Sequence, residues 1–123
     1  MNRNAVVIAA LLAAGCSATT DPRPTTIEYI SEAILVPSCG RTACHASGAN
    51  SHSYTFDTVA STKASLQRLV QPGNADASEL LQDMGESPRT GKRRGIMPPD
   101  GALPTADIDL IRTWIDDGAM GLR

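Results

Sequence analysis

Apolar residues in the middle of the chain recur every three or four positions, the spacing that places them on one face of an α-helix. Ile27, Ile30 and Ile34 form the first such set, and residues 25–28 fit a capping box whose first residue, a threonine, is the cap. Pro37 is predicted to end this helix, because proline lacks a backbone donor and its ring clashes with the preceding turn. No stretch alternates apolar and polar residues for long enough to predict a sheet, so we expect an all-α domain.

Three more helices follow from the same spacing and from start and stop signals. Residues 58–70 are predicted to form one, with Asp57 as its cap. Residues 76–84 are predicted to form a second, short helix that begins with an Asp-x-x-Glu cap. The last helix is expected to begin at a Thr105 cap and to end at Gly118. Its apolar stripe consists of Ile108, Ile111, Trp114 and Ile115.

The first sixteen residues have the pattern of an export signal. A positively charged start precedes an unbroken apolar run over residues 5–14, which is too short to span a bilayer and has the length of a signal-peptide core. The run ends in Gly15-Cys16, which resembles the lipobox of bacterial lipoproteins, whose cysteine is lipidated and becomes the N-terminus. The alternative is ordinary signal-peptide cleavage nearby, with Cys16 incidental. We expect a signal peptide over residues 1–15, a lipidated cysteine and tether over residues 16–25, and a folded domain over residues 26–123.

Length and composition limit the core that this domain can form. The chain has 123 residues, room for one domain, and its formal charge of −2 argues against a nucleic-acid partner. Aromatic residues are few, so we expect a bound macrocycle or disulfides to fill part of the interior. Export to an oxidising compartment, with Cys16 lipidated, leaves Cys39 and Cys44 as an even pair of thiols.

The chemistry of the chain is concentrated in residues 39–45, whose sequence is CGRTACH. Two thiols followed directly by a histidine are the arrangement that attaches c-type haem: Cys39 and Cys44 add to the vinyl groups as thioethers, and His45 coordinates the iron. The cysteines are separated by four residues instead of the usual two. Two alternatives stay open, a local disulfide between the two cysteines and a zinc site that uses both thiols with His52.

A histidine-ligated haem that only moves electrons requires a second axial ligand, commonly a methionine from a distant loop. Residues 85–104 hold four glycines and four prolines and are therefore expected to be such a loop. Met97 lies in it, directly before two prolines that fix the local backbone, and we expect it to be the second ligand. His52 is the competing ligand. Met84 and Met120 lie near helices, so we expect both to be core residues.

The order of elements from Ile27 to Gly118 resembles a class I c-type cytochrome domain. A first helix, a haem-attachment motif, intermediate helices, a methionine loop and a last helix follow one another. The stretch Met97-Pro98-Pro99 before the last helix is similar to the ending of many small bacterial members. The resemblance implies an all-α cytochrome c-like fold around one covalent haem c. It carries the haem-binding positions over to Cys39, Cys44, His45 and Met97.

In this family the first and last helices cross. Tyr29 and Trp114 are expected to supply aromatic contacts there, with Ala33 in the place where the family often has a glycine. The haem is expected to be surrounded by apolar side chains and to contribute their burial to stability. We therefore expect the haem-free chain to be poorly stable. The side chains expected around the haem are Ile34, Phe56, Leu66, Leu69, Leu80 and Trp114.

An iron with both axial positions filled has no open site for a substrate, so we expect an electron carrier and not an enzyme. Its partners would be redox proteins, and its lipid anchor would hold it to a membrane of the bacterial cell envelope, facing the periplasm or the cell exterior. Two other functions stay open: a haem-free exported lipoprotein with a Cys39–Cys44 disulfide, and a haem enzyme or sensor with an open iron site. A basic cluster before Met97 is either a solvated loop, a docking patch for an acidic partner or a neutraliser of haem propionates; it consists of Arg89, Lys92, Arg93 and Arg94.

Overall fold

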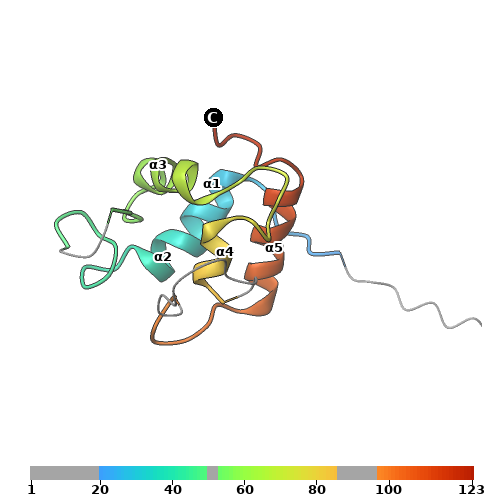
Figure 1. Cartoon of the computed structure of the whole chain (residues 1–123). Helices are drawn as coiled ribbons and strands as arrows, with labels where there is room; N and C mark the ends of the chain where they lie inside the picture. The colour runs from blue at the N-terminus through green and yellow to red at the C-terminus, as the bar shows by residue number, and fades with distance from the viewer. Residues whose placement is uncertain (1–19, 50–52, 86–96) are drawn as a thin grey trace, which may run out of the picture.

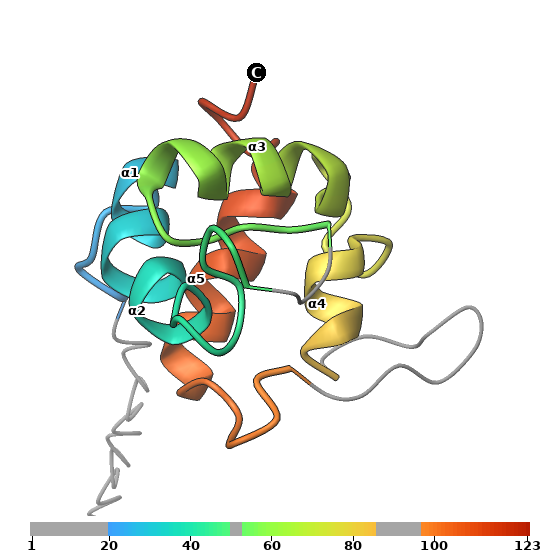
Figure 2. The same ribbon diagram turned by 90° about the vertical axis from the view of Figure 1, so that its left-hand side faces the viewer.

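The structure is a computed structural model that describes residues 20–49, 53–85 and 97–123, and every regular element within them is helical (Figure 1). The all-α prediction is confirmed for this part of the chain. None of the helices described there is long and apolar enough to cross a membrane. α3 packs against η1 and α4, and lies across the top of the bundle in Figure 2. In chain order the elements are α1 (Ile27–Tyr29), η1 (Ile30–Leu35), α2 (Val36–Cys39), α3 (Val59–Leu69), α4 (Glu79–Asp83) and α5 (Thr105–Asp116).

The first three elements form one unbroken helix that runs through Pro37, so the prediction that this proline ends the helix is wrong. The reason is η1, a π-helical segment in which the backbone holds one extra residue. Val36 N–H there donates to the Ser31 carbonyl, five residues back. Pro37 then stands in the first turn of α2, where its missing donor is tolerated. The helix continues beyond it, and Cys39 is the last residue of α2.

In the first helix and in α3, the residue that caps the helix is the one directly after the predicted cap. Thr26, and not Thr25, caps α1 by accepting a hydrogen bond from Tyr29 N–H at 3.3 Å. Thr58, and not the preceding aspartate, caps α3 in a reciprocal capping box with Ser61. Ser, Thr and Asp serve this position almost equally well, so adjacent residues of these types leave the cap undetermined by sequence.

The two aspartates expected to cap helices make tertiary contacts instead. Asp57 accepts from the backbone N–H of Ser47, in the loop after residue 45, at 2.8 Å. Asp76 forms an ion pair with Arg112 of α5 at 2.7 Å, and α4 begins only at residue 79. Both carboxylates therefore connect segments that are distant in the sequence.

The last helix ends as predicted and starts one residue off. Thr105 is the first residue of α5 and not its cap. Gly118 has φ +100°, which favours glycine, and its N–H donates to Ile115 O at 2.9 Å. Ala119 N–H donates to Trp114 O at 2.9 Å. These two bonds form a Schellman motif, so the predicted stop at Gly118 is confirmed.

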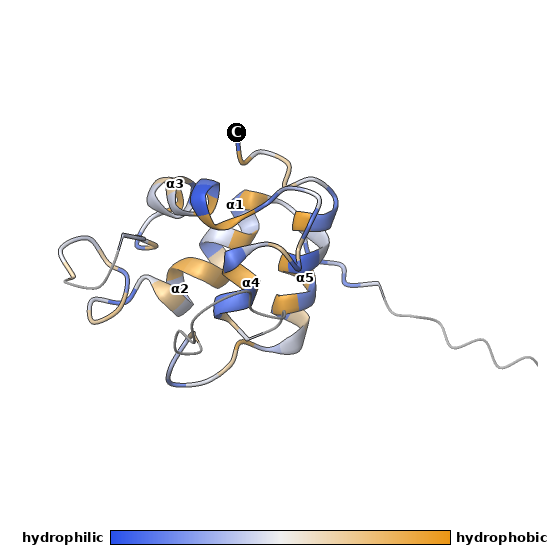
Figure 3. Cartoon of the chain, in the orientation of Figure 1, coloured by the Kyte–Doolittle hydropathy of each residue, from blue (hydrophilic) through white to orange (hydrophobic). Residues whose placement is uncertain are grey.

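The core is formed by side chains from α1, η1, α3, α4, α5 and the segments between them, with Cys39 of α2 packed against it. Figure 3 shows both apolar and polar residues along α4 and α5. The stripe Ile27, Ile30 and Ile34 is confirmed, since each is at most 2% exposed. The stripe of α5 is confirmed as well: Ile108, Ile111, Trp114 and Ile115 are at most 4% exposed. The six side chains expected to surround a haem are also no more than 5% exposed. They belong to the core cluster of the described residues.

Two residues assigned to the interior are exposed. Met120 is 74% exposed, so the prediction that it is a core residue is wrong, whereas Met84 is buried as predicted. Ala33 is exposed too and cannot take the place of a glycine at a helix crossing. η1 and α5 do pack against each other, and the small, fully buried residue on the first helix is Ser31. Tyr29 packs against the core cluster that contains the indole of α5.

The end of the predicted tether already contacts the domain. Arg23 forms ion pairs with Asp21 at 2.7 Å and with Asp107 of α5, and it donates to Ala106 O at 2.8 Å. Figure 1 shows this part of the chain leaving the domain beside α5. The contacts of the folded domain therefore begin before residue 26.

Candidate functional site

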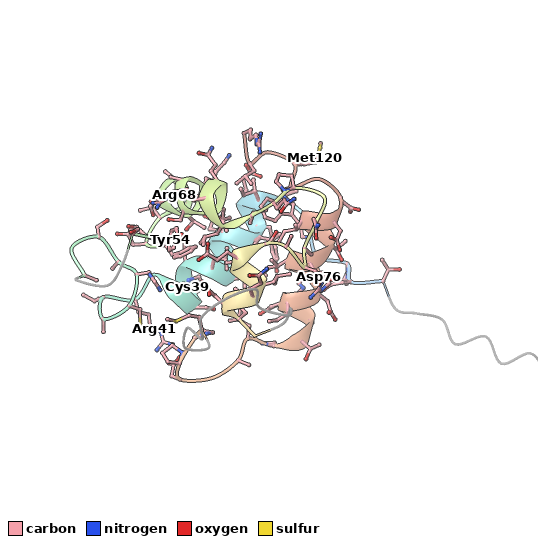
Figure 4. All side chains as sticks on the ribbon, in the orientation of Figure 1. Cys39, Arg41, Tyr54, Arg68, Asp76 and Met120 are labelled. Carbon is pink, nitrogen blue, oxygen red and sulfur yellow. The ribbon has the colours of Figure 1, made fainter. Side chains whose placement is uncertain are left out.

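Cys39, at the end of α2, lies half-buried against the core (Figure 4). Burial and, to a lesser degree, the neighbouring Cys44 raise the pKa of the Cys39 thiol to about 11, against the opposing effect of Arg41. Cys39 is therefore a neutral thiol at pH 7, and Cys44 is close enough to influence its ionisation. Both cysteines are thiols in the structure.

A tight turn takes up the four residues between the two cysteines. Cys44 N–H donates to Arg41 O at 2.8 Å, and His45 N–H donates to Cys39 O at 3.1 Å. The second bond spans six residues and closes the turn, so the longer spacing still returns His45 to the end of α2. The structure thus brings together in space the three residues that the sequence groups by spacing: Cys39, Cys44 and His45.

The imidazole of His45 is oriented by the segment that contains Tyr54 and Phe56. Its Nδ1 lies 3.1 Å from Tyr54 O, and its backbone carbonyl accepts from Phe56 N–H at 2.8 Å. The Phe56 ring meets the imidazole edge-on, with centroids 5.5 Å apart and planes at 83°. Because a carbonyl oxygen only accepts, Nδ1 must carry the proton in this bond. With Nδ1 as the donor, Nε2 is the second ring nitrogen, on the other side of the imidazole.

Gly40 allows this segment to approach the motif. A Cβ at Gly40 would stand 2.3 Å from Phe56 O and 2.7 Å from Val36 O, distances that no side chain tolerates. The glycine's φ is −78°, so space and not an unusual backbone angle requires it. Sequence reasoning missed both Gly40 and Tyr54. A glycine directly after the first cysteine was the available signal for the first, and no sequence signal marks the second, which acts through its carbonyl.

The loop after the motif is tied to the start of α3 through Asp57. Ser47 N–H donates to Asp57 Oδ2 at 2.8 Å, and Ser61 Oγ donates to Asp57 Oδ1 at 2.8 Å. The hydrogen bonds from Ser47 and then Ser61 lower the pKa of Asp57 to about 2. The side chain is therefore a carboxylate at neutral pH, which is the form that accepts both bonds.

Met97, in the loop expected over residues 85–104, is half-buried. Its backbone N–H donates to Asp83 O, at the end of α4, at 2.7 Å. Three residues later Asp100 forms an ion pair with Arg41 at 2.8 Å, and both side chains are 57% exposed. A groove of about 280 Å³ lies between Pro37–Arg41 on one side and Pro98–Leu103 on the other. The structure therefore places the two predicted site loops next to each other and joins them by one surface ion pair.

Several residues of the sequence predictions lie outside the described part of the chain. They include the lipidation candidate Cys16, the competing ligand His52 and the signal peptide over residues 1–15. The basic cluster before Met97 lies outside it too, namely Arg89, Lys92, Arg93 and Arg94.

Comparison with known proteins adds no relative: the chain matches no protein-family model, no curated protein and no solved structure.

Proposed function

We propose that the chain is a c-type cytochrome that carries single electrons, with one haem attached through Cys39 and Cys44. The proposal depends above all on the 3.1 Å contact between His45 Nδ1 and Tyr54 O. This contact gives Nδ1 a backbone partner and fixes the orientation of the imidazole, so that Nε2 would be the nitrogen that holds the iron. Metal-ligating histidines almost always have such a backbone or carboxylate partner on their other nitrogen.

The donor types present match those of a covalently attached haem with histidine and methionine ligands. Two neighbouring thiols suit two thioether bonds, and Cys39 carries its proton at neutral pH. His45 would supply an imidazole nitrogen, and Met97 would supply a soft thioether from the loop across the groove. When bound, the haem would supply the one-electron couple. The protein's own part is to orient His45, to keep Met97 in place and to exclude water with the core behind Cys39.

The Arg41–Asp100 ion pair supports Met97 as the second ligand, because it holds the methionine loop against the turn that carries His45. An exposed pair of this kind contributes only about 0–1 kcal/mol, so it biases the position of the loop without locking it. If His45 and Met97 both hold the iron, no position would remain for a substrate, and the protein would be a carrier and not an enzyme.

The proposal includes export and anchoring. The apolar run over residues 5–14 and the small residues before Cys16 support a lipidated N-terminus, which would hold the domain to a membrane of the cell envelope. The partners would then be redox proteins on that side of the membrane. Nucleic acid is not an expected partner, because the chain carries a net negative charge.

A haem-free lipoprotein with a Cys39–Cys44 disulfide is the second candidate function. The observation that favours it is the closed core: Ile34, Leu66 and Trp114 are buried among protein side chains. The two thiols are also close enough for Cys44 to influence the ionisation of Cys39.

Absorption spectroscopy of the protein from a host able to attach haem c tests these functions. Sharp low-spin bands in the reduced protein that carbon monoxide leaves unchanged are expected for the proposed carrier. A high-spin reduced spectrum that shifts with carbon monoxide would indicate an enzyme or sensor with an open site. A protein without visible bands would contradict the haem proposal and favour the disulfide.

The attachment residues are tested by substitution. Cys39→Ala and Cys44→Ala are each expected to reduce covalent haem, and the double variant is expected to lose it, since no thiol remains to form a thioether. Haem staining on denaturing gels measures this. Cys16→Ser, which leaves the motif intact, is the matched control and should stain as the unaltered chain does. Full staining of the double variant would contradict attachment at these residues.

A further inference from the structure

The carbonyl that faces His45 belongs to a peptide group held from its other side by α3. Ser65, in the middle of α3, is 6% exposed. Its Oγ accepts from Thr55 N–H at 2.9 Å and donates to Thr55 O at 2.8 Å. Thr55 N–H and Tyr54 O belong to the same peptide group, which is planar. Fixing the N–H therefore fixes the direction in which the carbonyl points.

Arg68, one turn further along α3, holds the same segment from the surface. Its Nη1 donates to Ser53 O at 3.1 Å, and its guanidinium lies 5.0 Å from the centroid of the Tyr54 ring. Figure 4 shows the two side chains together on one side of the molecule. α3 thus holds residues 53–55 through two side chains, the buried Ser65 and the exposed Arg68.

From this arrangement we infer that Ser65, assisted by Arg68, is a positioning residue that keeps Tyr54 O on the Nδ1 proton of His45 and so controls the orientation and donor strength of the imidazole. The inference rests on the proposed function. When the N–H of a peptide group donates a hydrogen bond, the carbonyl of the same peptide group becomes a stronger acceptor. A stronger acceptor on Nδ1 makes the imidazole a better electron donor through Nε2, which favours the oxidised iron.

Ser65→Ala tests the inference. It leaves the Thr55 N–H unpaired and the Tyr54 carbonyl less constrained, so the reduction potential is expected to rise. Amide hydrogen exchange at Phe56, whose N–H donates to His45 O, is expected to become about tenfold faster. Ser65→Thr keeps the hydroxyl and is expected to restore both values. Thr113→Ala is the matched control, because it removes a hydroxyl that bonds within α5 at 2.8 Å and leaves residues 53–55 untouched.

Two readouts separate positioning from a merely structural role. A Ser65→Ala protein that melts at a lower temperature but keeps the reduction potential of the unaltered chain would overturn the inference. Arg68→Ala, at an exposed position, covers the case in which Ser65→Ala does not fold. It is expected to raise the potential by a smaller amount, and an unchanged potential in Arg68→Ala would then overturn the inference.

The ring ¹⁵N shifts of His45 in the full chain separate this inference from the proposed function, because they report which nitrogen is protonated without reference to haem. If the unaltered chain carries no haem, the proposed function fails. The inference is then decided by these shifts: a loss of the Nδ1-protonated form in Ser65→Ala supports it, and an unchanged tautomer overturns it.

Discussion

Gly40 has no side chain, and the site depends on this, because a Cβ at this position would lie 2.3 Å from Phe56 O. Gly40→Ala is expected to destabilise the fold by about 1–3 kcal/mol, because the obstructing atoms are backbone and cannot rotate away. It is also expected to displace the segment that orients His45 and to lower the yield of attached haem. Denaturant unfolding and haem staining measure the two effects.

Gly48→Ala is the matched control for this change. Gly48 has φ +84° with open space around its Cβ position, so alanine there costs about 1–2 kcal/mol through backbone strain alone. It should leave haem attachment unchanged. Equal losses of haem in the two variants would show that Gly40 matters only for stability.

Met97→Ala is expected to keep the haem attached, because the two cysteines are untouched, but to lower its reduction potential. A thioether is a soft, weak donor that stabilises the ferrous form, and its loss also opens a coordination position to water or added ligands. Electrochemistry and the near-infrared absorption of the oxidised protein, which reads the methionine–iron bond, measure this.

His52→Ala is the comparison for Met97. If His52 were the ligand, the near-infrared band would be missing from the unaltered chain. The potential would then change in His52→Ala and stay the same in Met97→Ala, which would contradict the ligand assignment.

At the scale of single residues, the sequence identifies those whose side chains carry the chemistry and misses those that act through the backbone. Cys39, Cys44 and His45 are recognisable because their types and order are specific. Tyr54 contributes its carbonyl, which every residue has, and therefore leaves no signal in the sequence. Gly40 contributes space, and the need for it depends on a segment sixteen residues away.

At the scale of elements, Asp57 connects the loop after the motif to the start of α3. Its pKa in the folded protein is about 2, below the ordinary value of 3.8, so its carboxylate stabilises the fold above pH 4. This contribution is lost as the pH falls from about 4 to about 2. Asp57→Asn is therefore expected to lower the melting temperature at pH 7, with a difference from the unaltered chain that shrinks as the pH falls through this range.

Asp109→Asn is the control for this pH series, because it removes a carboxylate from the exposed side of α5. It should change the melting temperature little at any pH. A difference between Asp57→Asn and the unaltered chain that stays constant from pH 7 to pH 2 would contradict the role given to this carboxylate.

Helix positions were predictable from the sequence, whereas helix ends were less so. The stripe of α5 and the isoleucines of the first helix follow from periodicity, because burial on one face is what creates the pattern. Pro37 was misjudged because the π segment before it depends on packing and not on local propensity. Asp57 and Asp76 were misjudged because their partners, Ser47 and Arg112, are brought near only by the fold.

At the scale of the whole molecule, the described residues form a core although aromatic residues are few. The interior is built mainly from isoleucine and leucine, with Trp114 and Phe56 as its large members. A count of aromatic residues underestimates a core of this type, since aliphatic side chains bury comparable apolar area for each residue.

Membrane attachment is a property of the full chain that one substitution tests. Cys16→Ser is expected to release the domain from membranes while its haem stays attached, because the change removes the lipidation candidate and leaves Cys39, Cys44 and His45 intact. Fractionation of cells and detection of acyl chains measure this. Arg23→Ala, which removes contacts with α5 but keeps the cysteine, should remain on the membrane. A Cys16→Ser protein that stays acylated would contradict the lipoprotein assignment.

The π-helical turn over Ile30–Leu35 also sets the angle at which Cys39 leaves the bundle. Each residue of an α-helix advances the chain by about 100° around the axis. If the same residues were wound as regular α-helix, everything after this turn would be rotated by about that angle relative to the buried isoleucines. Cys39 would then turn away from the core, and Pro37 would stand where an α-helix needs its donor. The wide turn thus takes up one residue without the rotation that this residue would add to an α-helix, and it keeps Cys39 packed against the core.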